Sequence, residues 1–185
     1  MNRYGQLHLL GNILGLVIIC ALLSLVFFDQ LYHFDLPCPL CLLQRICFIA
    51  IGLAMLMNLY LGIKESHYGL MILGTLLGLG ISVRQIYLHL VPNDPGYGQL
   101  FLGANLYIWS AIGFAIILVF IAIALLFERG FNAKYEIQNK CFKILVIVFL
   151  FLILANGVST FIQCGPYICP SDPTRYYFFN THTGF

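Results

Sequence analysis

Five long apolar stretches dominate this 185-residue sequence. A membrane-spanning helix needs roughly 20 mostly apolar residues, and a segment alone in lipid must satisfy its own backbone hydrogen bonds. Each stretch is therefore predicted to be a transmembrane helix. The predicted spans are about 9–28, 46–63, 69–90, 106–127 and 144–162.

Charged residues make up only 9% of the chain, against about 25% in average soluble domains. So few charges cannot cover the surface of a soluble globule, which excludes an ordinary cytosolic domain and a disordered protein. A net charge of +2 offers no phosphate-binding face, which excludes a nucleic-acid binder. The chain is predicted to be an all-α integral membrane protein, one membrane domain over residues 1–185.

The first apolar stretch has an alternative interpretation, a cleaved signal peptide. Its apolar run is longer than the roughly 7–15 residues of a signal-peptide core. The sequence Phe27-Phe28-Asp29 also offers no small-residue cleavage site. We therefore expect this stretch to remain as the first span.

The lysines and arginines are distributed unevenly between the two sides of the predicted spans, which orients the chain. The richer side is expected to be cytoplasmic, with the N-terminus and the loops around 64–67 and 128–143. The other face then receives the loops 29–45 and 91–105 and the tail 163–185. The richer side holds Arg3, Lys64, Arg129, Lys134, Lys140 and Lys143, and the other side holds Arg45 and Arg175.

Seven cysteines divide between these compartments. Cys20 and Cys47 fall inside spans, where cysteine packs as a small hydrophobe, and Cys141 falls on the cytoplasmic side. The other four lie on the predicted outer side in two close pairs. They are Cys38 and Cys41 in Cys-Pro-Leu-Cys, and Cys164 and Cys169 in Cys-Gly-Pro-Tyr-Ile-Cys.

A Cys-x-x-Cys pair supports reversible redox chemistry, because its two-residue loop makes a strained and labile disulfide. If Cys41 lies near the N-terminus of the second helix, the helix dipole stabilises its thiolate. Arg45 follows four residues later and shares a face with Cys41 if the helix includes both. Its guanidinium could then stabilise a thiolate or an anionic ligand.

The two cysteine pairs and Arg84 also have alternative interpretations. Both pairs could be structural disulfides, although such short loops constrain little unfolded-chain entropy. The four thiols could bind zinc, but an oxidising compartment and the apolar neighbours Leu40, Leu42 and Leu43 argue against it. Arg84 lies roughly 9 Å inside its span at 1.5 Å per residue, either as a functional charge or reaching outward toward Asp94.

Two segments resemble a known family. Residues 37–45, which read Pro-Cys-Pro-Leu-Cys-Leu-Leu-Gln-Arg, resemble the first outer-loop signature of the disulfide bond formation protein B family. The sequence from Leu102-Gly103 to Tyr107-Ile108-Trp109-Ser110 resembles that family's entry into its fourth helix. The resemblance covers about residues 9–127 and implies a helical bundle with a four-helix core, to which this chain adds a fifth transmembrane helix.

The chain departs from the family pattern in two places. The best-known members carry their second cysteine pair in the loop between the third and fourth spans. In this chain the corresponding loop, 91–105, has no cysteine. Here the fifth span delivers Cys164 and Cys169 to the same side. The family often has Arg-His in its third helix, where this chain has Arg84-Gln85, and His89 one turn further on is a weak substitute. We interpret the chain as a five-span branch with a relocated second pair.

The resemblance implies an enzyme of the bacterial inner membrane, a protein-disulfide oxidoreductase that uses a quinone as electron acceptor and supports disulfide bond formation. The implied cofactor is ubiquinone or menaquinone. The implied partners are a periplasmic thioredoxin-like thiol oxidase and the lipid and quinone pool of the membrane, with neither nucleic acid nor metal. The redox-active residues would be Cys38, Cys41, Cys164 and Cys169, and the quinone-binding residues Gln44, Arg45 and Arg84.

The family also implies a relay. The reduced partner attacks the tail pair, and thiol–disulfide exchange passes the electrons to the first pair. Cys41, nearer the membrane, would meet the quinone, with Arg45 polarising a quinone oxygen. The residue that the partner attacks stays open, because Cys169 is expected to be more accessible while the family's order of pairs favours Cys164.

Three other functions are compatible with parts of the pattern. One is a thiol–quinone oxidoreductase of the vitamin K epoxide reductase type, whose catalytic pair would be expected near the fourth helix. Another is a non-catalytic membrane protein whose disulfides only stiffen loops. A transporter is disfavoured, because the spans lack carboxylates and the chain shows no repeated halves.

Overall fold

The computed structural model describes residues 3–32, 36–92, 94, 96–98, 100–127, 140–167, 169–170, 173 and 176–180. Three basic residues used in the topology prediction, Arg129, Lys134 and Arg175, lie outside the described residues.

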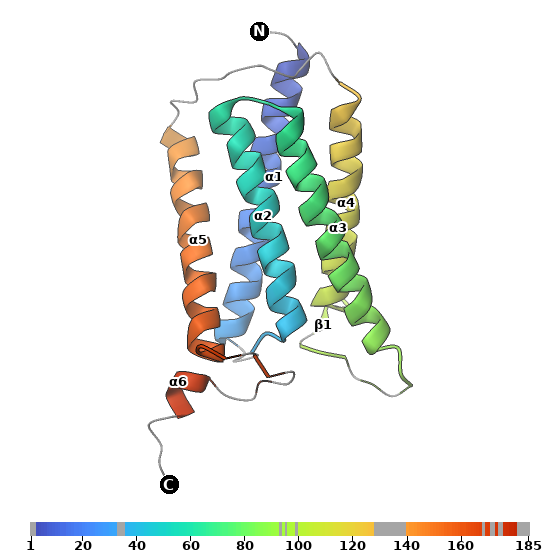
Figure 1. Cartoon of the computed structure of the whole chain (residues 1–185), viewed down its shortest axis with the longest axis vertical. Helices are drawn as coiled ribbons and strands as arrows, with labels where there is room; N and C mark the ends of the chain where they lie inside the picture. Colours follow the sequence, from blue (N-terminus) through green and yellow to red (C-terminus); the bar gives the residue numbers. More distant parts are fainter. Residues whose placement is uncertain are drawn as a thin grey trace.

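Five long helices run side by side and form a bundle, with the start of α1 at one end and the end of α5 at the other (Figure 1). All five are long and apolar enough to cross a membrane, which confirms the predicted all-α, multi-pass membrane fold. The central helix is α2, which packs against α1, α3 and α5, while α4 packs on α3. The helices are α1 (Arg3–Tyr32), α2 (Pro39–Leu61), α3 (Glu65–Leu88), α4 (Leu106–Leu125) and α5 (Lys140–Cys164).

The second helix begins seven residues earlier than its apolar stretch suggested, at Pro39 rather than about residue 46. Proline at the first helical position loses no hydrogen bond, because the N–H it lacks would be unsatisfied there anyway. The sulfur of Cys38 caps the helix by accepting the backbone N–H of Cys41 at 3.1 Å. Much of the predicted loop 29–45 is therefore helical, since α1 ends at Tyr32 and α2 begins at Pro39, and Cys41 and Arg45 lie inside α2.

Of the other helices, α1 and α5 extend beyond their apolar stretches at both ends, because polar residues there continue the helical backbone. In contrast, α3 begins and ends earlier than its stretch, and α4 ends earlier. The largest extension is in α1, whose 30 residues span about 45 Å at 1.5 Å per residue. The hydrocarbon core of a bilayer is only about 30 Å thick. The ends of α1 therefore extend beyond it, or the helix tilts.

Three small elements were not predicted. Strands β1 (Leu100–Phe101) and β2 (Ala104–Asn105) pair antiparallel, and a short helix, α6 (Tyr177–Asn180), follows α5. Positive φ angles of 51° at Leu102 and 82° at Gly103 close the hairpin, as a tight two-residue turn requires. Strands of two residues are too short to produce an alternating pattern that sequence analysis could detect.

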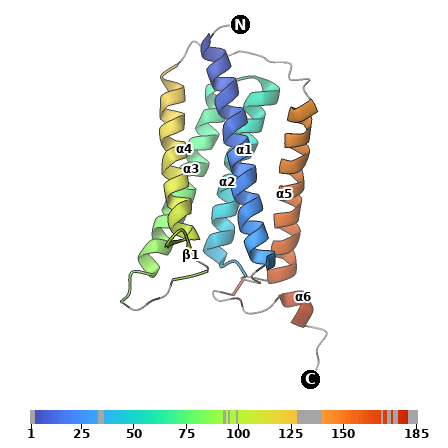
Figure 2. The same ribbon diagram turned by 180° about the vertical axis from the view of Figure 1, so that it is seen from behind.

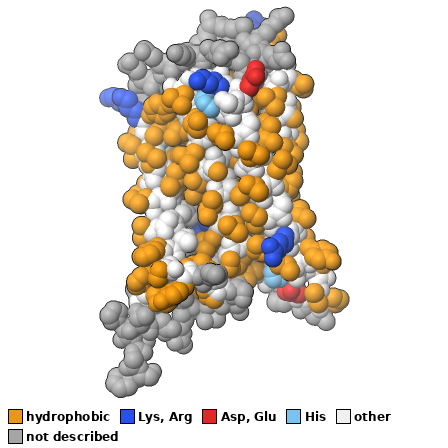
Figure 3. Space-filling view, viewed as in Figure 1, with side chains coloured by type: hydrophobic (Ala, Val, Ile, Leu, Met, Phe, Trp, Pro, Cys, Tyr) orange, Lys and Arg blue, Asp and Glu red, His pale blue; other side chains and the backbone are white. Residues whose placement is uncertain are grey.

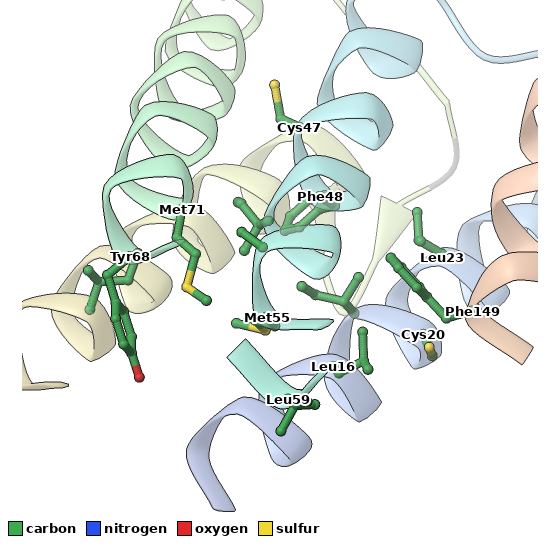
Figure 4. Packing of buried hydrophobic residues seen from close by; sticks show 14 of the residues in the cluster. Leu16, Cys20, Leu23, Cys47, Phe48, Met55, Leu59, Tyr68, Met71 and Phe149 are labelled. Atoms are coloured by element: carbon green, nitrogen blue, oxygen red, sulfur yellow. The ribbon is translucent and has the colours of Figure 1, made fainter. Parts of the chain in front are cut away.

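The surface of the bundle is largely apolar, and Figure 3 shows hydrophobic side chains covering its middle with charged side chains near the two ends. Inside, one cluster of buried side chains joins the helices, and Figure 4 shows part of it. Cys20 and Cys47 belong to this cluster as buried free cysteines, as the sequence predicted.

Close helix contact depends on a small residue between α2 and α5. The ring of Phe149 on α5 fills the space beside Gly52 on α2, where an added Cβ would lie 2.6 Å from the ring. Small residues let membrane helices approach closely, because packing rather than water exclusion holds such helices together.

A buried polar network lies at the end of the bundle opposite the cysteine pairs. Asn58 donates a hydrogen bond to Asn12 at 3.1 Å, and Asn12 donates one to the Tyr68 hydroxyl at 3.0 Å. His8 also contacts the Tyr68 hydroxyl at 2.8 Å, and His67 contacts the Asn58 carbonyl oxygen at 2.9 Å. These five side chains join α1, α2 and α3, and each satisfies polar groups that lipid could not.

We expect Gly52→Ala to lower the free energy of unfolding by about 1–3 kcal/mol, because the new methyl group must displace the Phe149 ring. Adding Phe149→Leu should restore part of the loss. Gly157→Ala on α5 is the control, since open space surrounds that position. The measurement is thermal unfolding in detergent, and equal stability of the two alanine variants would show that the close contact is unimportant.

Candidate active site

The start of α2 and the end of α5 lie at the same end of the bundle (Figure 1), and each carries one disulfide. Cys38 pairs with Cys41 at a Cα–Cα distance of 5.1 Å, and Cys164 pairs with Cys169 at 4.8 Å. Both distances lie within the usual range for disulfides. We call this end of the molecule the cysteine end.

The two sulfurs of the first pair have different surroundings. Cys38 is 6% exposed, and its sulfur receives the N-terminal N–H of α2 through the capping bond from Cys41. The sequence pattern predicts this effect of the helix N-terminus at Cys41 instead. Cys41 is half-buried and lines a small cavity.

A buried glutamine of α3 contacts both sulfurs. The side-chain nitrogen of Gln85 lies 3.3 Å from the sulfur of Cys38 and 3.4 Å from that of Cys41. Its carbonyl oxygen accepts a hydrogen bond from the side-chain nitrogen of Gln44 at 2.9 Å. Both glutamines are buried. Their hydrogen bond joins the start of α2 to α3 next to the disulfide.

Gln85 is not among the site residues predicted from the sequence, where it stands only as a departure from the family's Arg-His pair. A signal was available, since Gln85 is a polar residue inside an apolar span and such residues are functional candidates. Its partner Cys41 is 44 positions away, so the sequence could not indicate the contact.

Arg45 projects toward α1 and α5. Its guanidinium donates hydrogen bonds to the side-chain oxygens of Gln30 at 2.8 Å and Asn156 at 3.3 Å, and to the carbonyl oxygen of Val26 at 3.3 Å. Gln30 in turn donates to the hydroxyl of Ser159 on α5 at 2.8 Å. One buried hydrogen-bond network therefore joins α1, α2 and α5 beside the first cysteine pair.

A long apolar cavity of about 550 Å³ lies between α1 and α4 and over α2. Figure 2 shows α1 and α4 on the same face of the bundle. Apolar residues from all three helices line the cavity, and its polar side chains include Gln44, Arg45 and Ser110. The apolar lining includes Ile18 and Leu22 of α1, Met55 of α2 and Trp109 and Phe120 of α4.

A second cavity of about 60 Å³ adjoins the first, and Cys41 lines it. Gln44, Arg45 and Ser110 line both cavities. These three polar side chains therefore lie where the apolar space between α1 and α4 approaches the Cys41 sulfur.

The structure does not bring Arg84 to this site, in contrast to the sequence-based prediction. Arg84 is exposed and lines neither cavity. Successive residues of a helix point in directions about 100° apart, so the burial of Gln85 directs Arg84 away from the cysteines.

His89 lines neither cavity, and it is His89 rather than Arg84 that contacts Asp94. The Nδ1 atom of His89 lies 3.0 Å from the Asp94 carboxylate. The backbone N–H of Gly96 and the His89 side chain hold the pKa of Asp94 below its usual range.

A hydrogen bond from a glutamine side chain holds the second cysteine pair beside the first. Gln163, which is 2% exposed, donates a hydrogen bond from its side chain to the carbonyl oxygen of Pro37 at 2.8 Å. Pro37 precedes Cys38, and Gln163 precedes Cys164. The backbone segments that carry the two pairs therefore meet at the cysteine end.

Comparisons with known proteins identify relatives of this chain. Residues 9–98 match the family model described as disulfide bond formation protein DsbB, a region that includes Cys38 and Cys41 but not the second pair. A disulfide bond formation protein B of Chromobacterium violaceum is 34% identical, over 60% of this chain and 68% of that relative. One of Acinetobacter baylyi is 26% identical over 57% of this chain and 84% of the relative, and one of Xylella fastidiosa is 34% identical over 43% and 49%. No solved structure matches the chain significantly.

The fold and the site together define a multi-pass membrane oxidoreductase that forms disulfides. Two cysteine pairs at one end of a helical bundle and the matches to curated relatives carry this conclusion. The chain belongs to the disulfide bond formation protein B family, as a member whose described part has five helices of membrane-spanning length and whose second cysteine pair lies in the C-terminal region.

Replacing Arg45 with methionine is expected to lower the free energy of unfolding by about 1–3 kcal/mol, because buried oxygens on α1 and α5 lose their donor. Arg84→Met is the matched control, since Arg84 is exposed. Thermal unfolding of both variants in detergent makes the comparison. Equal losses would mean that the network around Arg45 does not hold the helices together.

Proposed function

We propose that this protein is a quinone-dependent thiol oxidoreductase that re-oxidises a periplasmic thioredoxin-like thiol oxidase. Electrons pass from that partner through the two cysteine pairs to ubiquinone or menaquinone in the membrane. The observation that carries the proposal is the position of Cys41, which lines a small cavity adjoining the long apolar cavity at Gln44 and Arg45.

The long cavity suits a quinone in both shape and chemistry. Its apolar walls from α1, α2 and α4 match an isoprenoid chain. Gln44, Arg45 and Ser110 offer N–H and O–H donors to carbonyl oxygens near the end where Cys41 lies. A bound quinone would supply an acceptor for two electrons and two protons.

The first exchange takes place in the tail. A thiolate of the reduced partner attacks the sulfur of Cys169, which forms a mixed disulfide and releases Cys164 as a thiolate. Cys164 attacks the sulfur of Cys38, which forms a Cys38–Cys164 disulfide and releases Cys41 as a thiolate. The segments meet through the Gln163–Pro37 hydrogen bond, which supports this exchange.

The second exchange restores the tail. The remaining thiolate of the partner attacks the partner's own sulfur in the mixed disulfide, so the partner leaves oxidised and Cys169 becomes a thiolate. Cys169 then attacks Cys164, which re-forms the tail disulfide and releases Cys38. Cys38 and Cys41 now hold the two electrons, and their disulfide re-forms when the electrons pass to the acceptor.

Accessibility supports this order within the tail pair. Cys164 is the last residue of α5 and is 6% exposed, next to the residue that binds Pro37. Cys169 is half-buried, and the neighbouring Pro170 is exposed. The order of pairs in the family would assign the two cysteines the other way round, so the two assignments differ in a testable manner.

The orientation follows from the basic residues. Arg3, Lys64, Lys140 and Lys143 lie at the end of the bundle opposite the cysteine end. With positive residues on the cytoplasmic side, the N-terminus is cytoplasmic and the cysteine end faces the periplasm from the bacterial inner membrane. This orientation places both pairs in an oxidising compartment.

Cys41→Ser is expected to abolish quinone reduction by the purified protein, because the thiolate nearest the cavity is removed. The assay follows the absorbance of a ubiquinone or menaquinone analogue with the reduced thiol partner as electron donor. Cys47→Ser is the matched control, a buried free cysteine of the same helix that should keep full activity. Full activity of Cys41→Ser would disprove the mechanism.

Mapping a trapped mixed disulfide tests the role of the tail. A thioredoxin-like oxidase whose second active-site cysteine is serine cannot resolve the mixed disulfide. We expect mass spectrometry to find it joined to Cys169, with Cys164 released. A bond to Cys164 would reverse the order, and no adduct at either residue would indicate purely structural disulfides.

A further inference from the structure

Gln85 is the residue of α3 that reaches the reactive sulfurs. Its side-chain nitrogen lies at nearly equal distances from both, 3.3 Å from Cys38 and 3.4 Å from Cys41. The side chain is 1% exposed, so water does not compete for these contacts. A buried amide N–H therefore points at the disulfide.

Gln44 determines which end of the Gln85 amide faces the sulfurs. The two ends of a glutamine amide are distinguished by their hydrogen bonds. The side-chain nitrogen of Gln44 donates to the oxygen of Gln85 at 2.9 Å, which leaves the nitrogen of Gln85 for the sulfurs. The reversed amide would turn a lone pair toward the sulfur lone pairs and would repel a thiolate.

The two sulfurs depend on Gln85 to different extents. The Cys38 sulfur also receives the backbone N–H of Cys41, at the N-terminus of α2. Within the described part of the chain, the Cys41 sulfur has Gln85 as its hydrogen-bond donor. The nearby guanidinium of Arg45 is hydrogen-bonded to Gln30, Asn156 and the Val26 carbonyl instead.

We propose that Gln85 is the hydrogen-bond donor that stabilises the Cys41 thiolate when the first disulfide is reduced, and that Gln44 holds the Gln85 amide in the required orientation. A hydrogen bond to a charged group is stronger than one to a neutral group, so the contact strengthens as the thiolate forms. The inference rests on the proposed function in one respect only, namely that the Cys41 thiolate passes electrons to a quinone.

The test measures thiolate formation without any quinone. Cys38→Ser in the full-length protein leaves Cys41 as a free thiol with the tail disulfide intact. The rate of Cys41 alkylation by iodoacetamide is followed from low to high pH, and mass spectrometry separates Cys41 from the other thiols. Gln85→Leu is added to remove the donor, and Gln85→Glu is added to replace it with a carboxyl group of the same shape.

We expect Gln85→Leu to move the pH of half-maximal alkylation upward by about one unit, the size of one hydrogen bond to a charged group. Gln85→Glu should move it at least as far, because a carboxylate repels the thiolate. Ser82→Ala is the control, a buried residue one turn away on α3 whose hydroxyl bonds to the carbonyl of Gly78. It should leave the midpoint unchanged.

Two outcomes overturn the inference. One is a midpoint in Gln85→Leu equal to that of the Cys38→Ser parent. The other is an equal shift in Ser82→Ala, which would attribute the effect to repacking of α3. If Gln85→Leu does not fold, the isosteric Gln85→Glu variant decides in the same way.

Quinone reduction in the protein with all cysteines provides a second measurement. Loss of Gln85 should lower kcat about tenfold at neutral pH and leave the KM for the quinone analogue unchanged, because the thiolate and not the binding site is affected. An alkylation shift in a protein that reduces no quinone would disprove the proposed function and leave the role of Gln85 intact. A normal midpoint in an active enzyme would disprove the role of Gln85 alone.

Discussion

The hydrogen bonds of Arg45 are the interaction on which the arrangement of this bundle depends. A guanidinium among membrane helices must find acceptors within the protein, because lipid offers none. Arg45 finds them on α1 and α5, at Gln30, Asn156 and the carbonyl of Val26. The same side chain lines both cavities, so the interaction that positions the helices also places a positive charge where the apolar space meets Cys41.

The fifth long helix, α5, brings the second cysteine pair beside the first. Its end carries the second disulfide to the cysteine end, where Gln163 binds the carbonyl of Pro37. The two cysteine pairs therefore adjoin through residues 126 positions apart in the sequence. For the relay proposed above, the two pairs need only lie side by side, and α5 brings the second pair to the first.

Much of the architecture could be predicted, because a membrane makes hydrophobic length a direct indicator of structure. Five apolar stretches became five helices, and two close cysteine pairs became two disulfides. Helix ends were less accurate, since a proline and a capping sulfur decide where α2 begins and hydropathy does not report either. Arg84 was included in the site because a charge in an apolar span is conspicuous, but only the helix rotation reveals that it points outward.

The sequence by itself determined the class of the protein, through its apolar lengths, its few charges and the spacing of Cys38, Cys41 and Arg45. Those features are local, and each has a direct physical meaning within a few residues. Only the tertiary structure decided which polar side chains contact the sulfurs of Cys38 and Cys41. Gln85 approaches them from α3, and its amide is oriented by Gln44 of α2. The physical reason is that a buried hydrogen bond depends on the rotation and depth of two packed helices, which are set by contacts between residues far apart in the chain.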